Sequence, residues 1–436
     1  MPTEVRTTQA AGDGPELPVT SFIDSYLDYV GLTEAPIFYH RWCCISMLGA
    51  YLGRQYHFSL GHFDIYTNMY AMLIGEPGAR KSTAIKIAKK IITGAGYDKI
   101  SADKSSKEKF MLDLAGVEDE DKKGASGIDD ILDSNLWGNE EGDGTDAEMY
   151  IACDEFNDFI GLGNMEFISL LGNMWDYNGD FKNRIKTGKS VIIHNPTVSI
   201  LGGNTSTSFA NAFPPDTLGQ GFFSRLLLIQ GEGTGRKITF PVMPSAIETA
   251  AVIRKLQQIK IEVRGKAKLT PGAEQLLDKI YKTTPAMEDT RFISYSNRRF
   301  THLIKLCLVI SAAHYSTVVT EAHVVEANTI LTHTEHLMPK ALGQFGKGRN
   351  SDITHKVMTI LNETYVPLAI KDIWKLVHND MEKLNDLVDM LRNLLAAEKV
   401  LCVGGAYLGK QKMVEEVNND MLDYGYLTNE ERGMRK

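Results

Sequence analysis

The spacing of hydrophobic and polar residues divides the chain into a helical start, an alternating middle and a largely helical second half. Between residues 21 and 56, aromatic and aliphatic side chains recur at helical spacing, which predicts mainly helix. From about Phe58, apolar runs of strand length alternate with helical patterns. Residues 70–74 form one such run, a glycine-containing loop follows it, and residues 82–92 show the apolar repeat of a helix. Strand, glycine loop and helix in this order predict an α/β fold.

Later apolar runs predict four more strands, at residues 149–153, 191–193, 198–201 and 226–229. Residues 117–146 interrupt this pattern because they are acidic and rich in glycine and serine, and we interpret them as a long surface insertion. Residues 245–342 are mostly helical in pattern, and a glycine-rich hinge follows at 343–349. Residues 351–410 then show three helical patterns and a hairpin that turns at Gly404 and Gly405, which is the order of a winged helix.

These boundaries predict five segments, in agreement with the two to four domains plus tails that roughly 150 residues per domain would give. In chain order they are an N-terminal tail and helical segment (1–58), an α/β core that contains the acidic insertion (59–240), a helical domain (241–345), a winged-helix domain (349–410) and a charged tail (411–436).

The composition argues against several classes of protein. The chain of 436 residues has 47 basic and 55 acidic residues, which excludes a wholly basic nucleic-acid coat protein but permits a local basic patch. No apolar run approaches the ~20 residues that cross a bilayer, and the first 18 residues lack the apolar block of a signal peptide. The five cysteines show no CxxC spacing, which argues against a zinc site or a disulfide framework. We therefore expect a soluble, cytoplasmic protein with no membrane partner.

The strongest chemical signal is the sequence GEPGARKS at residues 75–82. It fits the phosphate-binding pattern G-x-x-x-x-G-K-[ST] at Gly75, Lys81 and Ser82, whereas Arg80 replaces the second glycine. In such a loop, backbone N–H groups surround a phosphate, the lysine contacts the β- and γ-phosphate oxygens, and the hydroxyl binds Mg²⁺. Because arginine adopts positive φ less readily than glycine, we expect position 80 to be helical or strained. The alternative is a Gly/Pro turn capped by Ser82. The candidate ATP-binding residues are Gly75, Pro77, Gly78, Ala79, Arg80, Lys81, Ser82 and Thr83.

Two further strand ends carry polar side chains that suit ATP hydrolysis. Asp154 and Glu155 follow the apolar run 149–153, which is the Walker B arrangement: Asp154 would hold Mg²⁺ and Glu155 would polarise the attacking water. Asn204 follows the run that begins at Thr197 and would sense the γ-phosphate. Each feature also has a simpler interpretation, as a solvated strand-end pair and as a Gly-Asn turn.

Cationic residues form three more candidate sites. Four of them lie on a predicted hairpin and would contact a nucleic-acid backbone, unless the hairpin is merely solvated: Lys182, Arg184, Lys186 and Lys189. Arg225 precedes the run 226–229, where it would reach a neighbouring subunit's γ-phosphate as an arginine finger or form a structural ion pair. Arg298 and Arg299 begin a helix, and we assign Arg299 as a second nucleotide contact from the helical domain.

Taken together, these motifs resemble those of AAA+ ATPases of the hexameric helicase type, including the superfamily 3 helicases of viruses and plasmids. Residues 70–229 more closely resemble the phage and prophage P-loop ATPases of the primase-helicase and replicative helicase group. The segments that carry the resemblance are 75–83, 154–155, 178–180, 195–203 and 221–225.

The resemblance implies an AAA+ core with a helical lid, ATP and Mg²⁺ as cofactors, and a homo-oligomeric ring, in this family a hexamer. It also implies single-stranded DNA in the central channel and a place in the cytoplasm of a bacterial host. The catalytic residues would be Lys81, Asp154, Glu155, Asn204 and Arg225, with Ser82 and Asp154 as Mg²⁺ ligands. Related proteins often carry a primase domain in front, and we expect no primer synthesis here because the N-terminal segment is too short for one.

The predicted function is an ATP-dependent DNA helicase or translocase of phage or mobile-element replication, which moves DNA with its basic hairpin. The alternative is an ATP-switched helicase loader or replication-initiation adaptor that does not unwind DNA, and a packaging motor is a weaker third. The predicted third helix of the winged helix is acidic, with Asp380, Glu382, Asp386 and Asp389, which disfavours contact with phosphates. We therefore prefer protein contact, with a replication initiator or primase as the candidate partner, or packing within the ring for this domain, and DNA contact through its wing is the other option.

Overall fold

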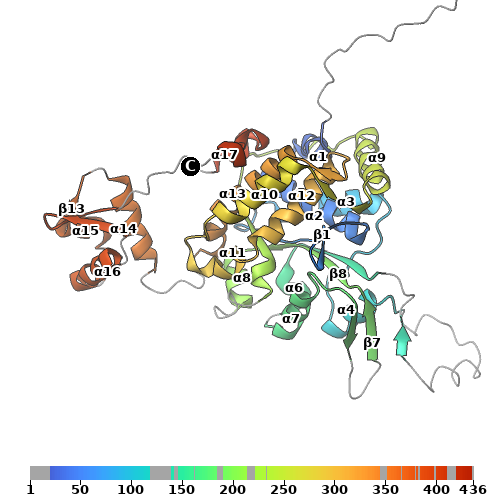
Figure 1. Cartoon of the computed structure of the whole chain (residues 1–436), viewed down its shortest axis with the longest axis horizontal. Coiled ribbons are helices and arrows are strands. Elements are labelled where there is room, and N and C mark those ends of the chain that lie inside the picture. The colour runs from blue at the N-terminus through green and yellow to red at the C-terminus, as the bar shows by residue number, and fades with distance from the viewer. Residues whose placement is uncertain are drawn as a thin grey trace, which may run out of the picture.

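The computed structural model describes most of the chain (Figure 1). The described ranges are 20–117, 139–141, 146–161, 163–183, 190–213, 221–231, 233–343, 351–364, 366–378, 380–381, 383–396, 399–409 and 419–434. Strands and helices alternate through the first half, and helices dominate after the last long strand, so the predicted α/β fold is confirmed at this level.

A four-stranded parallel sheet forms the centre of the main body. Its strands stand in the order β5 (Glu148–Cys153), β8 (Thr197–Asn204), β3 (Tyr70–Ile74) and β9 (Leu226–Gln230). Every residue of β3 and β8 is buried, as expected for apolar parallel strands that are covered on both faces. The register pairs Ile74, the last residue of β3, with Asn204 on one side and Gln230 on the other. These carboxyl ends therefore meet at one edge of the sheet.

Helices surround this sheet. Those drawn above it in Figure 1 are α1 (Phe22–Val30), α2 (Ile37–Leu52), α3 (Lys81–Gly94) and α9 (Ala246–Glu262). Those drawn below it are α4 (Lys107–Leu114), α6 (Phe156–Ile160), α7 (Met165–Asn173) and α8 (Ser206–Ala212). α2 is buried along almost its whole length because it packs against the sheet and against α1, α3 and α12 (Arg299–Ala313).

The helical region after β9 is built on two long helices. α13 (Glu321–Leu342) packs against β9 and against α12, and α12 packs against α2. α10 (Pro271–Thr283) packs on α13, and α11 (Ile293–Ser296), which follows the short turn η5 (Thr290–Phe292), contacts the turn η4 (Phe223–Arg225) that leads into β9. The helical region thus shares one core with the sheet.

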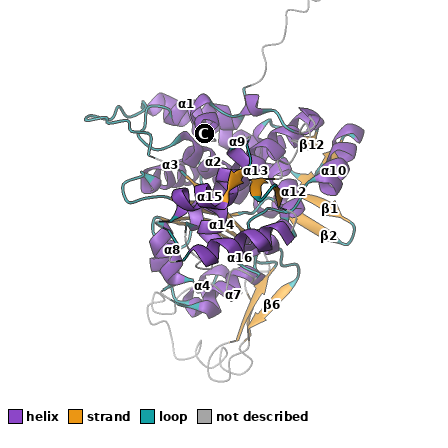
Figure 2. Ribbon diagram, turned by 90° about the vertical axis from the view of Figure 1, so that its left-hand side faces the viewer, coloured by secondary structure: helices purple, strands orange, loops and turns teal. Residues whose placement is uncertain are grey.

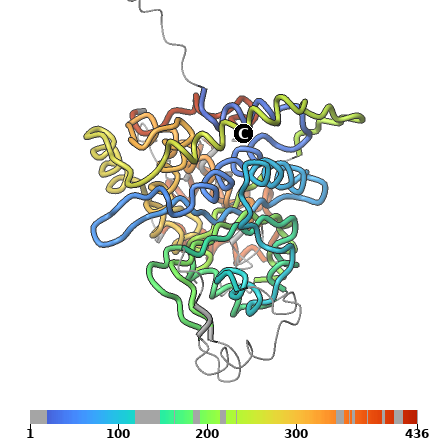
Figure 3. The backbone as a smooth tube through the Cα atoms, turned by 90° about the vertical axis from the view of Figure 1, so that its right-hand side faces the viewer, coloured from blue at the N-terminus to red at the C-terminus, as the bar shows by residue number. Residues whose placement is uncertain are grey.

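Within the described residues, three smaller sheets lie at the edges of the main body. The first joins β10 (Gly265–Lys266), β1 (Tyr56–Leu60) and β2 (Phe63–Tyr66), and the turn η1 (Gly53–Gln55) lies just before β1. The second pairs β11 (Lys268–Leu269) with β12 (Val318–Val319). The third joins β4 (Asn139–Glu141), β7 (Ser190–His194) and β6 (Asp180–Asn183). Figure 2 shows the β1–β2 hairpin at the side and β6 near the bottom, and in Figure 3 the green strands β6 and β7 extend downward from the body.

Residues 351–409, here called the C-terminal module, have a hydrophobic core of their own. The module contains α14 (Ser351–Glu363), α15 (Ile370–Val377), α16 (Leu384–Ala396) and an antiparallel sheet of β13 (Leu368–Ala369), β15 (Ala406–Gly409) and β14 (Val400–Val403). Gly404 and Gly405 have φ values of 61° and 81°, which a two-residue turn between right-twisted strands requires. The predicted order of elements is therefore present, but the third helix begins at Leu384 and not at Asp380, which lies in the preceding turn.

Residues 419–434, here called the C-terminal segment, return to the main body. They form the turns η6 (Asn419–Met421) and η7 (Tyr424–Tyr426) and the short helix α17 (Asn429–Gly433), which contact α13 and α2. Glu431 is fully buried and forms an ion pair with Arg41 of α2, with 2.6 Å between Nε and Oε1. The sequence suggested a charged tail from residue 411, whereas this described part of it is packed. Among the helices of the described ranges, none combines the length and the apolar character needed to cross a bilayer.

Candidate functional site

The loop that follows β3 surrounds the ammonium group of Lys81. Lys81 is the first residue of α3 and is buried, and its Nζ donates hydrogen bonds to the carbonyl oxygens of Gly75 at 2.7 Å and Glu76 at 3.1 Å. Burial lowers the pKa of Lys81, and the carboxylates of Glu155 and Glu76 oppose this effect. A positive charge therefore lies inside a backbone loop at a helix N-terminus, which is a favourable place for an anion.

Arg80 occupies the strained backbone conformation that the sequence left as one of two options. Its φ and ψ are 63° and 23°, in the left-handed region, where a non-glycine residue costs of order 1–3 kcal/mol. Its guanidinium pairs with Glu34 at 2.5 Å, and Glu34 also accepts a hydrogen bond from the backbone N–H of Ile238 at 2.7 Å. The bond from Ile238 and the charge of Arg80 together lower the pKa of Glu34. Glu34 therefore links the loop to the segment that follows β9.

The remaining candidate residues lie on the loop and in the first turn of α3. Pro77 and Gly78 are exposed at the tip of the loop, and Gly78 has a φ of 85°, which glycine adopts without strain. Ala79 is buried beneath the tip, while Ser82 is half-buried and Thr83 exposed in the first turn of α3.

The acidic pair lies at the same edge of the sheet, directly after β5. Glu155 directly precedes α6 and is exposed, and its side chain makes no capping hydrogen bond to this helix. Asp154 is half-buried and pairs with Lys86 of α3 at 2.8 Å. A Cβ atom at Gly203 would overlap the backbone oxygen of Asp154, so glycine at this position lets the end of β8 approach the acidic pair closely. Asp154 and Glu155 are thus separated from the Lys81 loop only by the strand that ends at Asn204.

Asn204 is fully buried between the loop and the acidic pair. Its backbone oxygen accepts a hydrogen bond from the N–H of Gly75 at 3.4 Å, and its side-chain Nδ2 donates to Oδ1 of Asn157 at 2.8 Å. Its Oδ1 has no hydrogen-bond partner within the described part of the chain. An unpartnered buried amide oxygen is unfavourable by itself and indicates a place where a ligand or water would bind.

Two side chains that the sequence did not indicate complete this edge. Gln230, the last residue of β9, has a buried Oε1 that lacks a partner among the described residues. The Tyr39 hydroxyl of α2 donates to the backbone oxygens of Ile74 at 2.6 Å and Gly231 at 3.1 Å, and burial raises the pKa of this phenol. Tyr39 therefore holds together the ends of β3 and β9, from which the loop begins.

Arg225 lies at the opposite edge of the sheet. It directly precedes Leu226, which pairs with Tyr70, the first residue of β3, so the length of a five-residue strand, about 16 Å, separates it from the loop. Its guanidinium lies 5.8 Å from the ring centre of Trp175, and burial and then the charge of Arg298 lower its pKa. Arg225 therefore does not meet Lys81 within one chain.

The structure does not bring Arg299 to the loop either. The neighbouring Arg298 lies close enough to Arg225 to lower its pKa, which places the start of α12 at the amino-terminal edge of the sheet. The guanidinium of Arg299 pairs with Glu335 at 2.8 Å and donates to Asn328 and Thr332 of α13 at 3.0 Å. These contacts are those of a buried structural ion pair.

The basic hairpin is described only in part. β6 and β7 pair antiparallel, from Asp180 with His194 to Asn183 with Val191, and Lys182 is exposed on β6. Arg184, Lys186 and Lys189 lie outside the described residues.

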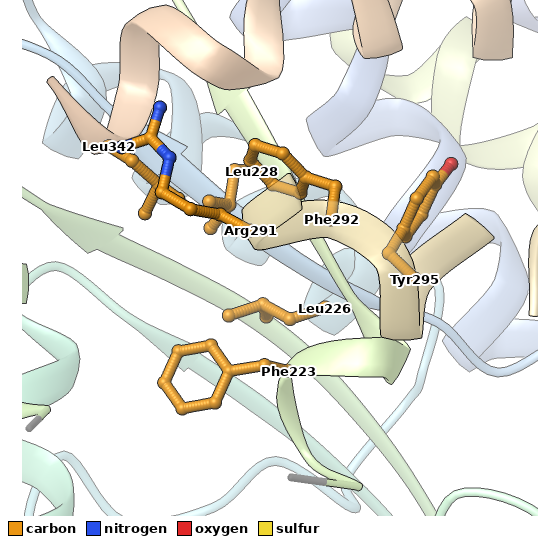
Figure 4. A pocket seen from close by; sticks show the side chains of 7 residues that line it. All are labelled: Phe223, Leu226, Leu228, Arg291, Phe292, Tyr295 and Leu342. Carbon is orange, nitrogen blue, oxygen red and sulfur yellow. The ribbon is translucent and has the colours of Figure 1, made fainter. Parts of the chain in front are cut away.

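A small cavity lies elsewhere, between β9 and the helical region (Figure 4). It has room for about one water molecule, and its lining residues are Phe223, Leu226, Leu228, Arg291, Phe292, Tyr295 and Leu342. It is too small for a nucleotide and belongs to the packing between β9, α11 and α13.

The donor set at the carboxyl edge fits Mg²⁺ only together with a phosphate. No group of three or more His, Cys, Asp or Glu in the described ranges could hold a metal ion by itself. Ser82 and Asp154 supply two hard oxygen ligands, and Mg²⁺ typically completes its shell with water and substrate phosphates.

No protein-family model matches this sequence, and a search of curated proteins finds no match. Function is therefore inferred from the residues of this chain alone.

Proposed function

We propose that this protein is an ATP-dependent, ring-forming DNA translocase or helicase of phage or mobile-element replication, with an AAA+ core, a helical lid and a winged-helix domain. It would act in the cytoplasm of a bacterial host. The observation that carries the proposal is the meeting of Lys81, Asp154, Glu155 and Asn204 at one edge of a parallel sheet. The family is proposed from the order of these motifs.

The topology of the sheet supports this assignment. β8, which ends at Asn204, lies between β3, which precedes the loop, and β5, which precedes the acidic pair, and β9 lies on the far side of β3. The parallel strands therefore place the three predicted motifs side by side at their carboxyl ends. An isolated parallel bridge between Ile100 and Tyr150 adds a fifth position beyond β5.

The proposed reaction is hydrolysis of the γ-phosphate. The loop N–H groups and Lys81 would bind the β- and γ-phosphate oxygens, and Glu155 would accept a proton from the water that attacks the γ-phosphorus as ADP leaves. Mg²⁺, held by Ser82 and Asp154, would neutralise charge on the phosphates. Lys81 would exchange its bonds to the carbonyl oxygens of Gly75 and Glu76 for bonds to the phosphates.

Arg225 is proposed to act on the ATP of a neighbouring protomer. It cannot reach the loop of its own chain, and it lies in a region with excess positive charge: Lys305 and Arg298 are near it, and Asp176 is the carboxylate they share. Lys305 is fully buried, whereas Arg225 and Arg298 are half-buried, so these two cations suit a phosphate that approaches the amino-terminal edge from outside. ATP bound between two protomers would contact the loop of one protomer and Arg225 of the other.

The alternative function is an ATP-switched helicase loader or initiation adaptor. One observation favours it: Asp386 and Asp389 are exposed on α16 of the C-terminal module, so this helix would repel a DNA backbone. The module would then bind a replication initiator or primase. The hairpin that carries Lys182 favours the translocase, because a loader does not require a cationic channel loop.

The test combines ATP hydrolysis, oligomer size and duplex unwinding, each with and without single-stranded DNA. Lys81→Ala should abolish ATP binding or turnover, whereas Lys90→Ala, an exposed lysine on the same helix, should not. Glu155→Gln should bind ATP without hydrolysing it. Arg225→Ala subunits should lower the ATP hydrolysis of mixed rings in proportion to their share of the subunits. Arg264→Ala, which changes an exposed arginine, is the matched control. Unwinding only in the presence of a separate helicase would favour the loader, and a protein that never binds ATP would exclude both functions.

A further inference from the structure

Asn157 forms one link in a chain of side-chain hydrogen bonds that begins at Asn204. Nδ2 of Asn204 donates to Oδ1 of Asn157 at 2.8 Å, and Nδ2 of Asn157 donates to the backbone oxygen of Ser208 at 2.6 Å. Asn157 lies on α6, two residues after Glu155, and Ser208 lies on α8. These hydrogen bonds therefore connect the end of β8 with α8 through a residue that lies next to the acidic pair.

The direction of this chain is fixed by chemistry. The Ser208 carbonyl can only accept, so Asn157 must turn its NH₂ group toward it and its oxygen toward Asn204. That oxygen can also only accept, so Asn204 must present its NH₂ group to Asn157. The orientation of both amides thus follows from one backbone oxygen, which removes the usual ambiguity between the nitrogen and oxygen of an amide.

The consequence is that Asn204 offers an acceptor, and not a donor, at the carboxyl edge. Its Oδ1 is buried and has no partner among the described residues, and Asn204 lies beside Gly75 at the end of β8. A carbonyl oxygen repels a phosphate oxygen but accepts a hydrogen bond from water. This atom therefore suits the attacking water better than the γ-phosphate.

We infer that Asn157 is a positioning residue, which holds Asn204 so that its Oδ1 orients the attacking water together with Glu155. The inference rests on the proposed ATP hydrolysis. The water would donate one hydrogen bond to Asn204 and give its other proton to Glu155, its oxygen would bond to the γ-phosphorus, and the bond to ADP would break. Asn157 itself would touch neither water nor nucleotide.

The test compares two substitutions that lose the same bond to Ser208. Asn157→Asp keeps an oxygen that can accept from Asn204, whereas Asn157→Leu has a similar size and no acceptor. Asn157→Leu should lower kcat about tenfold, as expected for the loss of one buried hydrogen bond, with KM and the Kd of a nonhydrolysable ATP analogue unchanged. Asn157→Asp should stay within about threefold of the parent. Asp158→Asn, an exposed change on the same helix, is the control.

A double-mutant cycle identifies the route of the effect. In an Asn204→Ala background, Asn157→Leu should have no further effect on kcat. A full tenfold loss in that background, or equal losses for the Leu and Asp variants, would overturn the inference while ATP hydrolysis itself stands. If Asn157→Leu does not fold, Asn157→Ala takes its place in the same cycle. A parent protein whose ATP binding does not depend on Lys81 would overturn the proposed function and this inference together.

Discussion

Removing the negative charge of Glu431 should lower the free energy of unfolding of the main body. The loss should be larger than for any other single charge change in the C-terminal segment. Glu431 is fully buried and Arg41 is 2% exposed, and two hydrogen bonds join them, at 2.6 Å from Nε and 2.8 Å from the second guanidinium nitrogen. Glu431→Gln keeps the shape of the side chain but removes the carboxylate that pairs with the buried guanidinium, whose remaining counter-charges are Glu326 and Asp24. Breaking one partner of such a pair typically costs about 3–5 kcal/mol.

The adjacent Glu430 provides a matched control. It pairs with Arg236 at 2.7 Å, and about a third of each side chain is exposed. Exposed pairs contribute about 0–1 kcal/mol, so Glu430→Gln should change the free energy of unfolding by less than about 1 kcal/mol. Unfolding in urea can be followed by tryptophan fluorescence, because Trp42 is buried and donates to Thr334 of α13, close to where the segment docks.

The pH dependence gives an independent check. Burial raises the pKa of Glu431, but Arg41 and the hydrogen bonds from Thr428 outweigh it, so the folded pKa lies below the ordinary value of 4.5. A carboxylate with a lowered pKa stabilises the fold above its unfolded pKa, and this stability is lost as the pH falls through the folded pKa. The parent should therefore lose stability in acid more steeply than Glu431→Gln. Equal urea midpoints for the two Gln variants at neutral pH would refute this account of how the segment is held.

Three further predictions concern the loop and its surroundings. Arg80→Gly relieves the left-handed backbone strain and Arg80→Ala does not, so the Gly variant should be about 1 kcal/mol more stable to urea than the Ala variant; equal stability would show that position 80 is unstrained. Gly203→Ala would push a Cβ onto the backbone oxygen of Asp154, so it should lower the free energy of unfolding by about 1–3 kcal/mol and slow ATP turnover. Gly233→Ala, whose Cβ would face open space, should do neither. Because burial lowers the pKa of Lys81, the Kd for an ATP analogue should begin to rise at a pH below the ordinary lysine value of 10.5; a constant Kd up to that pH would contradict the burial of the ammonium.

The sequence predicts best where local pattern decides the structure. The apolar run before Gly75 and the apolar repeat after Ser82 predict a buried strand and a helix, and both form. The Gly404–Gly405 pair predicts the turn between two strands because few other residues adopt two successive positive φ values. At Arg80 the sequence left two options, a helical or a strained backbone, and the φ of 63° shows the strained one.

The sequence predicts poorly where partners are far apart along the chain. In the sequence Glu431 is part of a charged tail, and nothing local points to its partner Arg41, which is 390 positions away. Arg299 looks free to meet a nucleotide because it begins a helix, yet Glu335 of the next long helix binds it. Asn157 is an inconspicuous polar residue in the sequence, and only the approach of β8 and α8 gives it two partners. Such pairings depend on tertiary packing, which periodicity does not encode.

The C-terminal module is connected to the main body on both sides, because the C-terminal segment docks there. α13 precedes the module in the chain, and the docked C-terminal segment follows it. Arg41, which receives that segment, lies on α2 only two residues from Tyr39, whose hydroxyl holds the carbonyl of Ile74 where the loop begins. The helix that receives the C-terminal segment is therefore the same helix that supports the start of the loop around Lys81.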